Sequence, residues 1–585
     1  MAETKAPNTS AEQLITEHLD IWTTAIEQKS SSGRGSSKKF SLYGIKKLRK
    51  LILELAVRGK LVQQDSNDKP VDGLLKLISD ERDALEKQKK IRKIAKQLEI
   101  KEDEKLFSIP KGWQYVRFGE LTFNRDGERK PVAASQRKEL QGEYDYYGAS
   151  GVIDKVNEYL FDKSLLLIGE DGANLISRST PIAFIAHGKY WVNNHAHVID
   201  GVSLEFLNYI ALFINAISLE PYITGTAQPK MNQAKMNSIP VAVPPIEEQQ
   251  RIVAKVDELM GLCDALEAQT ENSITAHQTL VEVLLEALLK APEQTATPEQ
   301  ATAQFQQNWQ RLSEHFDTLF TTTASIDTLK QTILQLAVMG KLVPQNPNDE
   351  PAAKLLERIA VEKAQLIKDK KIKKQKPLPE LTNEEKPFEL PNGWEWVTLS
   401  HIGLFTGGKT PSKANSQYWN GDIPWVTPKD MKVEEIFDSE DHVTRLAITD
   451  GLAEIDPESL LFVARSGILR RKFPVAITKS VCTVNQDLKV LSLIDKSIVD
   501  YTLLMMKGFE AYILKNLTKM GTTVESLRFD DFSKHYFIIP PLEEQYRIVA
   551  KVDELMALCD QLKARLNDAQ NTKLQLTDAI VEQAV

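Results

Sequence analysis

Two segments of the chain place apolar residues at intervals of three and four, the spacing typical of an amphipathic helix. The apolar positions are Ile45, Leu48, Leu51, Ile52 and Leu55 in the first segment and Ile326, Leu329, Ile333 and Leu336 in the second. Gly59 and Gly340 follow these segments, and glycine is a common signal for the end of a helix. In both segments a turn-like Asn-Asp-Lys-Pro or Asn-Asp-Glu-Pro comes next, followed by a second amphipathic helix and a lysine-rich stretch.

A longer apolar pattern occurs twice further along the chain and predicts two long helices. It comprises Ile252, Val256, Leu259, Cys263 and Leu266 in the first helix and Ile548, Val552, Leu555, Cys559 and Leu562 in the second. Spacings that alternate between four and three are typical of a coiled-coil seam. We expect these residues to serve spacer-helix packing, with the two helices antiparallel to one another within the chain; homodimerisation through one seam is the alternative.

The segments 114–243 and 395–539 have a different pattern, with short β-like runs between clusters of Gly, Asn, Asp and Pro. Examples are SLLLIG at 164–169 and LLFVARSG at 460–467. Helices are expected near 203–218 and 497–515. Both segments are therefore predicted to be compact α+β domains.

The helical regions are an internal duplication. The segments PPIEEQQRIVAKVDELMGLCDALEA at 244–268 and PPLEEQYRIVAKVDELMALCDQLKA at 540–564 are identical at 20 of 25 positions. Upstream, ILELAVRGKLV at 52–62 returns as ILQLAVMGKLV at 333–343, and a Pro-x-Gly-Trp that ends at Trp113 returns at Trp394. The upstream pairs are offset by 281 residues and the downstream pair by 296, so the 15 extra residues lie between Trp394 and Pro540. Two dissimilar domains are thus inserted into two copies of one frame.

This organisation predicts eight parts. They are an N-terminal helix and linker (1–40), a first repeated helical region (41–113), a first inserted domain (114–243), a first long helix (244–290), a linker and helix (291–331), a second repeated helical region (332–394), a second inserted domain (395–539) and a second long helix (540–585). The half boundary falls in the proline-containing stretch 291–301.

Composition narrows the class of protein. The chain has 585 residues, of which 42% are apolar and 26% charged, as in soluble globular proteins of more than one domain. No apolar run reaches the roughly 20 residues of a membrane span, and the N-terminus lacks signal-peptide features, so we expect a cytoplasmic protein. Three cysteines exclude a disulfide framework. The net charge of −8 requires any DNA binding to come from local patches or from partner proteins.

Three motifs could suggest catalysis or metal binding, and we interpret none of them so. Gly403, Gly408, Lys409 and Thr410 fit the P-loop pattern, but Pro411 and the following residues predict a loop where a nucleotide site needs a helix. The double prolines precede Ile or Leu, whereas an amino-methyltransferase would place an aromatic residue there. His195 and His197 would share one face of a strand, but no third ligand is in register, so structural or DNA-facing roles are expected.

The chain resembles the specificity subunit of type I restriction-modification systems over nearly its whole length. The resemblance rests on the doubled PPIEEQQRIV and PPLEEQYRIV helix entries, the doubled Pro-x-Gly-Trp, GGKTPS at 407–412 and YWNGDIPWVTPKDM at 418–431. It implies two target recognition domains separated by two long antiparallel coiled-coil spacer helices with internal pseudo-two-fold symmetry. Each domain would read one half of a bipartite, asymmetric double-stranded DNA target.

The resemblance also implies partners and the absence of catalysis in this chain. Two modification (methyltransferase) subunits would dock on the repeated helices, and restriction/translocase subunits would join them. S-adenosylmethionine, ATP and Mg²⁺ are expected on those partner subunits, and no catalytic or metal-binding residue is expected here. A coiled-coil scaffold that binds proteins without DNA is the competing function, and a self-sufficient nuclease or methyltransferase is a third.

Candidate DNA contacts are side chains that can donate to bases or phosphates from glycine-containing loops. In the first inserted domain they are Arg125, Arg129, Lys130, Arg178, Gln228 and Lys230. In the second they are Lys409, Thr410, Ser412, Arg465, Ser466, Arg470, Arg471 and Lys472. For any one of them, a solvated surface position is the alternative.

Overall fold

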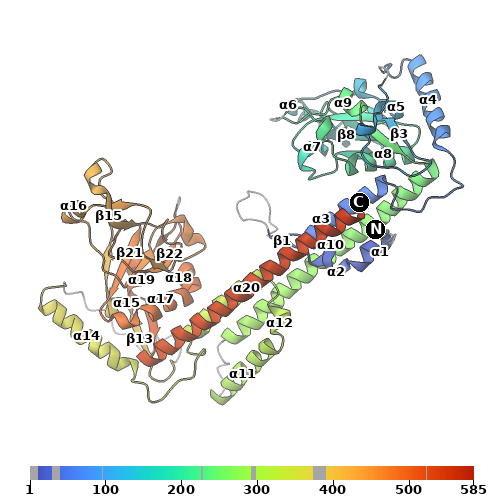
Figure 1. Cartoon of the computed structure of the whole chain (residues 1–585). Coiled ribbons are helices and arrows are strands. Elements are labelled where there is room, and N and C mark those ends of the chain that lie inside the picture. Colours follow the sequence, from blue (N-terminus) through green and yellow to red (C-terminus); the bar gives the residue numbers. More distant parts are fainter. Residues whose placement is uncertain are drawn as a thin grey trace, which may run out of the picture. The chain divides into compact units, whose positions relative to one another are not determined.

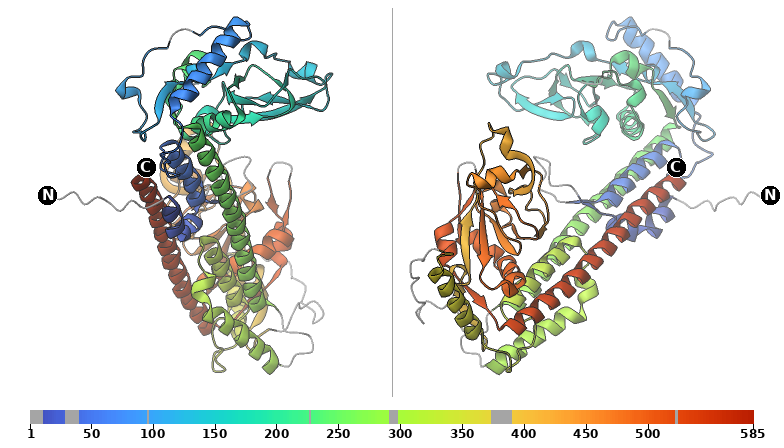
Figure 2. Two further views of the ribbon diagram at one scale, coloured as in Figure 1. Left: turned by 90° about the vertical axis from the view of Figure 1, so that its right-hand side faces the viewer. Right: turned by 60° about the vertical axis from the view of Figure 1, so that its left-hand side comes forward.

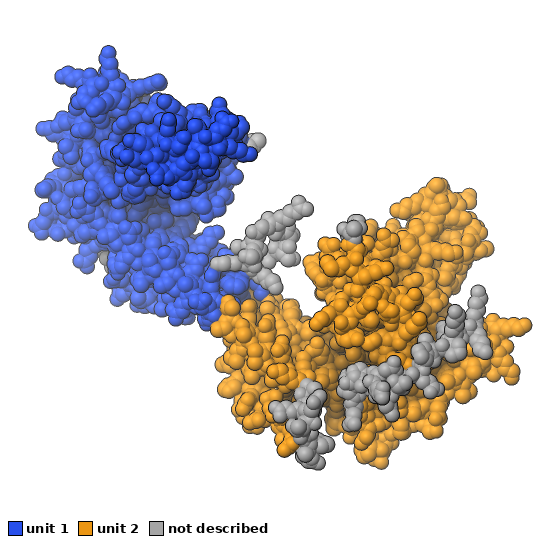
Figure 3. All heavy atoms as spheres, turned by 180° about the vertical axis from the view of Figure 1, so that it is seen from behind, with its two compact units in different colours: residues 1–274, 568–585 blue, residues 275–567 orange. Residues whose placement is uncertain are grey.

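The chain divides into two compact units (Figure 3). Unit 1 contains residues 1–274 and 568–585, and unit 2 contains residues 275–567. The computed structural model describes residues 11–28, 40–94, 97–225, 228–290, 298–372, 390–521 and 524–585. Two long helices, α10 (Ile246–Leu289) and α20 (Leu542–Ala584), each begin in one unit and end in the other.

In unit 1, helix α3 (Tyr43–Val57) packs with the first part of α10 and the last turns of α20 (Figures 1 and 2). Arg49 on α3 pairs with Asp264 on α10 at 2.6 Å, and the Tyr43 hydroxyl donates to Asp578 on α20 at 2.8 Å. The predicted seam positions Ile252, Val256, Leu259 and Cys263 are buried in this core, and Leu266 packs against it. Within unit 1, the seam residues of α10 therefore pack against α3, the amphipathic helix of the same repeat. The spacing of the apolar residues did not identify α3 as their partner.

Unit 2 repeats this arrangement with α13 (Thr323–Val338), the first part of α20 and the last turns of α10. Lys330 pairs with Asp560 at 2.7 Å, at the positions that Arg49 and Asp264 occupy in unit 1. Ile548, Val552 and Cys559 are buried in this core, and Leu555 and Leu562 pack against it. Cys263 and Cys559 are buried free thiols, in agreement with a packing role.

Each inserted domain is fastened to its frame by a pair of antiparallel strands. In unit 1, β3 (Gln114–Arg117) enters the domain and pairs with β12 (Pro240–Val243), which leaves it. In unit 2, β13 (Glu395–Thr398) pairs with β24 (Tyr536–Ile539) in the equivalent register. Because entry and exit lie side by side, the domain between them can differ in length without disturbing the frame, which accounts for the 15 extra residues of the second copy.

The inserted domains share one topology although their sequences differ. The strands of the first are β4 (Phe123–Asn124), β5 (Tyr144–Gly148), β6 (Gly151–Val156), β7 (Phe161–Asp162), β8 (Leu165–Gly169), β9 (Ala183–Ala186), β10 (Lys189–Val192) and β11 (Ala196–Asp200). Those of the second include β14 (Gly403–Gly407), β15 (Trp419–Val426), β16 (Glu435–Ile436), β17 (His442–Val443), β18 (Ser459–Val463), β19 (Val475–Thr478), β20 (Thr483–Val484) and β21 (Leu488–Leu493). One sheet has the order β4-β11-β8-β9 and its counterpart β14-β21-β18-β19-β16.

A helix packs on each of these domains near the place the sequence predicts. Helix α8 (Leu204–Ala216) corresponds to the expected 203–218, and α17 (Val499–Gly508) with α18 (Glu510–Asn516) to 497–515. Helices α4 (Val71–Lys87) and α14 (Ala352–Lys368) are the expected second amphipathic helices. The fold is therefore α+β in both units. Residues 29–39 of the expected N-terminal linker and residues 291–297 of the expected half boundary lie outside the described residues.

Buried carboxylates join the two frame segments of each repeat at the base of its inserted domain. Glu248, near the start of α10, accepts a hydrogen bond from Trp113 Nε1 at 2.9 Å, and Glu544 on α20 accepts one from Trp394 Nε1 at 3.1 Å. Both carboxylates are 1% exposed. Burial raises the pKa of each of them. The repeated Glu-Glu-Gln and Gly-Trp sequences thus contact one another in each unit.

Gly59 and Gly340 make this contact possible. Their φ angles of 66° and 67° are in the left-handed region, and a Cβ atom on Gly59 would lie 2.4 Å from Cγ of Pro110. Glycine therefore ends the amphipathic helix and lets the Pro-x-Gly-Trp turn pack directly on its end.

The raised pKa of Glu544 predicts a specific pH dependence. A carboxyl group whose pKa is higher in the folded state stabilises the fold below its unfolded pKa of about 4.3, and this contribution is lost as the pH rises through the folded value. Glu544→Gln keeps an acceptor for Trp394 and removes the charge. We expect the unfolding free energy of the native protein minus that of Glu544→Gln to fall as the pH rises above about 4.3, as measured by urea denaturation; parallel pH curves would contradict it.

Candidate nucleic-acid interface

Three chain segments meet at one end of the main sheet in unit 1. Strand β8 ends where β11 begins, with Gly169 opposite Ala196, so the residues after β8 lie beside the turn before β11. Glu170 N donates to the carbonyl oxygen of His195 at 2.9 Å, and Met231 N donates to that of Glu170 at 2.8 Å. The segment 228–232 is therefore tied to both the turn and the loop.

The same segments meet in unit 2, although their side chains differ. Ala464 N donates to the carbonyl oxygen of Asp487 at 2.8 Å, in the turn between β20 and β21. Leu527 N donates to the carbonyl oxygen of Ala464, also at 2.8 Å. The two loop clusters are equivalent, because each lies at the same end of the four strands that the two sheets share in the same order.

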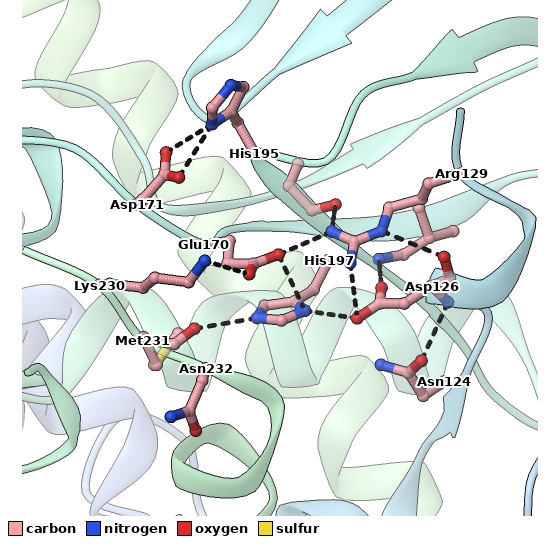
Figure 4. A network of polar contacts seen from close by, with 12 residues as sticks. Asn124, Asp126, Arg129, Glu170, Asp171, His195, His197, Lys230, Met231 and Asn232 are labelled. Atoms are coloured by element: carbon pink, nitrogen blue, oxygen red, sulfur yellow. Dashed lines mark hydrogen bonds and ion pairs between the residues drawn. The ribbon is translucent and has the colours of Figure 1, made fainter. Parts of the chain in front are cut away.

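A dense ionic network occupies this position in unit 1 (Figure 4). Arg129 donates to Glu170 at 2.8 Å and to the carbonyl oxygen of Ala196 at 2.7 Å. Lys230 approaches the other oxygen of Glu170 at 3.0 Å. The charges of Arg129 and Lys230 thus serve to hold the loops together, and their guanidinium and ammonium groups are already engaged within the domain.

His197 is the most deeply buried member of this network, with 1% of its surface exposed. Its Nδ1 lies 2.6 Å from Asp126 Oδ2 and its Nε2 lies 3.0 Å from the carbonyl oxygen of Met231. Both ring nitrogens thus lie within hydrogen-bond distance of an oxygen acceptor, one on a side chain and one on the backbone. His195 instead pairs with Asp171 at the surface. A structural role, as predicted, therefore describes His197.

The two acidic members of the network favour their ionised forms. Burial opposes ionisation of Asp126, but the hydrogen bond from His197 and the charge of Arg129 lower its pKa. Burial likewise opposes ionisation of Glu170, and Arg129, His197 and Lys230 lower its pKa. Cations and carboxylates here stabilise one another in a largely buried setting.

Two of the six residues singled out in the first domain, Gln228 and Lys230, lie on the segment 228–232, and the Arg129 side chain reaches the network from the residues that follow β4. Arg125 pairs with Asp200 at 3.0 Å; Arg129 and Lys230 belong to the network; Lys130 and Gln228 are exposed. Arg178 is different, because it adopts a φ of 49° and its guanidinium donates to the carbonyl oxygen of Ile217, at the end of α8, at 2.7 Å. Burial lowers the pKa of Arg178. This arginine therefore stabilises a helix end.

All eight residues singled out in the second domain lie on two loops. Lys409, Thr410 and Ser412 follow β14, and Arg465, Ser466, Arg470, Arg471 and Lys472 lie between β18 and β19. Thr410 Oγ1 donates to Gln486, Ser466 Oγ accepts from Ile468 N, and Arg470 pairs with Glu525. Within the described residues, the side chains of Lys409, Arg465, Arg471 and Lys472 have no hydrogen-bond or ion-pair partner. This domain thus keeps four unpaired cations on its loops, whereas among the described candidates of domain 1 Lys130 is the unpaired one.

Several residues of the two clusters were not identified from the sequence. They are Asp126, Glu170 and Asn193 in the first domain and Asn485, Gln486, Asp487 and Glu525 in the second. The signal that could have found some of them is the Val-Asn dipeptide at 192–193 and 484–485, which precedes a β-like run in both domains.

The sequence motifs that could have indicated catalysis or metal binding do not form the corresponding sites. Residues after Thr410 form a loop, with no helix starting at Lys409, so the P-loop interpretation is excluded as expected. Over the described part of the chain, no three His, Cys, Asp or Glu side chains are grouped to hold a metal ion. Among those same residues, no helix has the length and apolar character needed to cross a membrane.

Comparison with known proteins identifies relatives of the whole chain. The family model described as type I restriction modification DNA specificity domain matches residues 110–276 and 391–570. The chain is 38% identical over 603 residues to the type I restriction enzyme EcoEI specificity subunit of Escherichia coli, covering 98% of this chain and 100% of the relative. It is 36% identical over 614 residues to the EcoAI specificity subunit of the same organism, with 98% and 100% covered. A chain in a solved structure of a type I R-M system has 17% identity and a TM-score of 0.42, covering 82% of this chain and 98% of that one.

The ionic network in unit 1 predicts that two neighbouring substitutions lower the unfolding free energy by unequal amounts. Asp126→Ala removes the carboxylate that pairs most closely with buried His197 and one of the two that pair with Arg129, and we expect it to lower the unfolding free energy by about 3–5 kcal/mol. His195→Ala removes the pair with Asp171, in which the histidine side chain is 51% exposed, and should cost at most about 1 kcal/mol. Urea denaturation followed by circular dichroism measures both. Equal effects would show that the network does not stabilise the loops.

Proposed function

This chain belongs to the specificity subunits of type I restriction-modification systems, and we propose that its two inserted domains each read one half of a bipartite, asymmetric DNA target. It is the non-catalytic subunit that gives such a system its DNA sequence specificity. The observation that carries the proposal is that one frame is present twice while the loop clusters mounted on it differ in charge and sequence. Two copies of one frame that carry different loops are suited to reading two different half-sites a fixed distance apart.

We assign the parts of the chain accordingly. Target recognition domains 1 and 2 are residues 114–243 and 395–539. The frame consists of 41–113 with 244–290 and of 332–394 with 540–585, while 1–40 and 291–331 are the N-terminal and central connections. The frame acts as an antiparallel pair of spacer helices, since a helix of on the order of 23 residues covers one DNA turn of about 34 Å.

Loop residues of both domains make the DNA contacts in this proposal. In domain 2, the unpaired Lys409, Arg465, Arg471 and Lys472 suit phosphate or guanine contacts. In domain 1, Lys130 and Gln228 are exposed, whereas Arg125, Arg129 and Lys230 would have to exchange an internal carboxylate for DNA. Arg178, which holds the end of α8, is the weakest of the original candidates.

The duplicated frame also suggests how partners assemble. Two equivalent surfaces suit two copies of one modification subunit, which would supply much of the phosphate contact that a chain of net charge −8 lacks. Restriction/translocase subunits complete the complex, which we place in the cytoplasm with its DNA. S-adenosylmethionine, ATP and Mg²⁺ would bind those partners.

Single-molecule methylation sequencing tests the function. DNA from cells that express this chain with the modification subunit of its own system should carry methylated adenines in one motif, split by a gap of constant length. If a purified complex of this chain and the modification subunit forms but its DNA stays unmethylated and unbound, the protein is a scaffold without DNA recognition.

Arg465 provides a prediction at the level of one residue. Arg465→Ala removes an unpaired cation beside the turn of domain 2, so we expect binding of the assembled complex to target DNA to weaken about tenfold and its salt slope to fall by about one. Lys496→Ala is the matched control, because Lys496 donates to the carbonyl oxygen of Pro457 at the opposite end of the sheet. Fluorescence anisotropy at several salt concentrations measures binding. Loss of subunit assembly would instead assign Arg465 to a protein interface.

A further inference from the structure

We propose that Asn194 and Gln486 are equivalent base-reading residues, each of which recognises an adenine in the major groove of its half-site. The inference rests on the proposed function and deepens it, because it names the base and the residue. Neither side chain is basic, and neither belongs to a sequence motif of the frame. Their equivalence becomes visible only through the strand registers of the two domains.

The registers align the two turns residue by residue. Val192 lies opposite Tyr147 in the parallel pair β10–β5, and Val484 lies opposite Val426 in the parallel pair β20–β15. On the other side of the turn, Ala196 of β11 faces the last residue of β8, and Leu488 of β21 faces the last residue of β18. Three residues separate the aligned positions in both domains, so Asn194 and Gln486 occupy the same place.

Both turns are held rigidly from within. The Asn193 side chain is 4% exposed and its Oδ1 accepts from His195 N at 2.8 Å; Asn485 is 7% exposed and its Oδ1 accepts from Asp487 N at 3.0 Å. The buried asparagine therefore fixes the backbone on each side of the central residue.

The side chain at the centre of each turn points to solvent; in domain 1 His195 is exposed as well and pairs with Asp171. Asn194 and Gln486 are exposed, while the asparagine before each is buried. The turns are also fixed from outside, because Glu170 N and Ala464 N donate to the carbonyl oxygens of the residues that follow. A reading side chain on such a support loses little conformational freedom on binding, which favours discrimination between bases.

The chemistry of both side chains matches one base. An amide presents one acceptor and one donor, which is the complement of the N6 amino group and N7 of adenine in the major groove. Thr410 donates to Gln486 Oε1, which orients the amide and leaves the second lone pair of that oxygen for the N6 amino group and the NH₂ group for N7. Asn194 is the same amide with one methylene fewer.

The surrounding charges suit a groove-reading position. Arg465 N donates to the carbonyl oxygen of Asp487 at 3.2 Å, and Lys409 precedes Thr410, so two unpaired cations flank Gln486. Such cations contact phosphates and position the reader without carrying sequence information. In domain 1, Arg129 and Lys230 are engaged with Glu170, so the exposed amide is the base-reading group that both domains share.

Gln486→Ala and Asn194→Ala test the proposal, with each half of the motif as the control for the other. In cells that contain the modification subunit, we expect Gln486→Ala to relax one adenine position in one half of the methylated motif by about 10-fold to 100-fold and to leave the other half unchanged. Asn194→Ala should do the same in the opposite half. A native motif that persists in both variants would overturn the inference, whereas a native protein that yields no split motif would overturn the proposed function.

A binding measurement decides the case in which a variant loses methylation altogether. The purified complex is titrated with target DNA in which one adenine at a time is replaced by 7-deazaadenine, which lacks the N7 acceptor. We expect one adenine per half-site at which this replacement weakens binding of the native complex about tenfold. At that adenine, the complex carrying the alanine variant should be insensitive. Equal sensitivity of native and variant complexes at every adenine would exclude both residues as readers.

Discussion

The structure depends on a buried hydrogen bond between an indole and a carboxylate, made once in each unit. Trp113 donates to Glu248 and Trp394 donates to Glu544, at the point where the Pro-x-Gly-Trp turn, the amphipathic helix and the start of a long helix meet. A carboxylate at this depth is costly unless it is hydrogen-bonded, so the contact is selective for the one arrangement that supplies a donor. Because the entry and exit strands of the inserted domain adjoin this junction, the contact also fixes where each domain is attached.

The way each inserted domain is attached lets its loops vary without altering the frame that holds it. Strand pairs β3–β12 and β13–β24 bring the ends of an inserted domain together, so loops at the far end can change without altering the frame. Four strands of the two sheets also follow the same order, which places the variable loops at the same end of each domain. Loop sequence can therefore change while each domain keeps its attachment to its own copy of the frame.

The two loop clusters are stabilised by different polar interactions. The first neutralises its cations internally, with Glu170 between Arg129 and Lys230 and Asp126 beside His197. The second relies on backbone hydrogen bonds and leaves Lys409 and Arg465 without a partner among the described residues. Among the described candidates, the second cluster therefore offers more free charge to a phosphate backbone than domain 1, where Lys130 is the exposed cation without a partner.

The sequence by itself determined the duplication, the helical frame and the position of the inserted domains, because repeated segments and apolar periodicity are local properties of the chain. It also indicated the loops on which most candidate contacts lie, from their glycines and cations. It did not reveal that Arg178 holds the end of α8, that Asp126 and Glu170 neutralise the nearby cations, or that Asn194 and Gln486 are equivalent. Those facts depend on which strands pair and in what register, and pairing joins residues far apart in the sequence whose contacts leave no periodic signal. Tertiary structure alone therefore decided which of the polar side chains are bound internally and which are free to meet DNA.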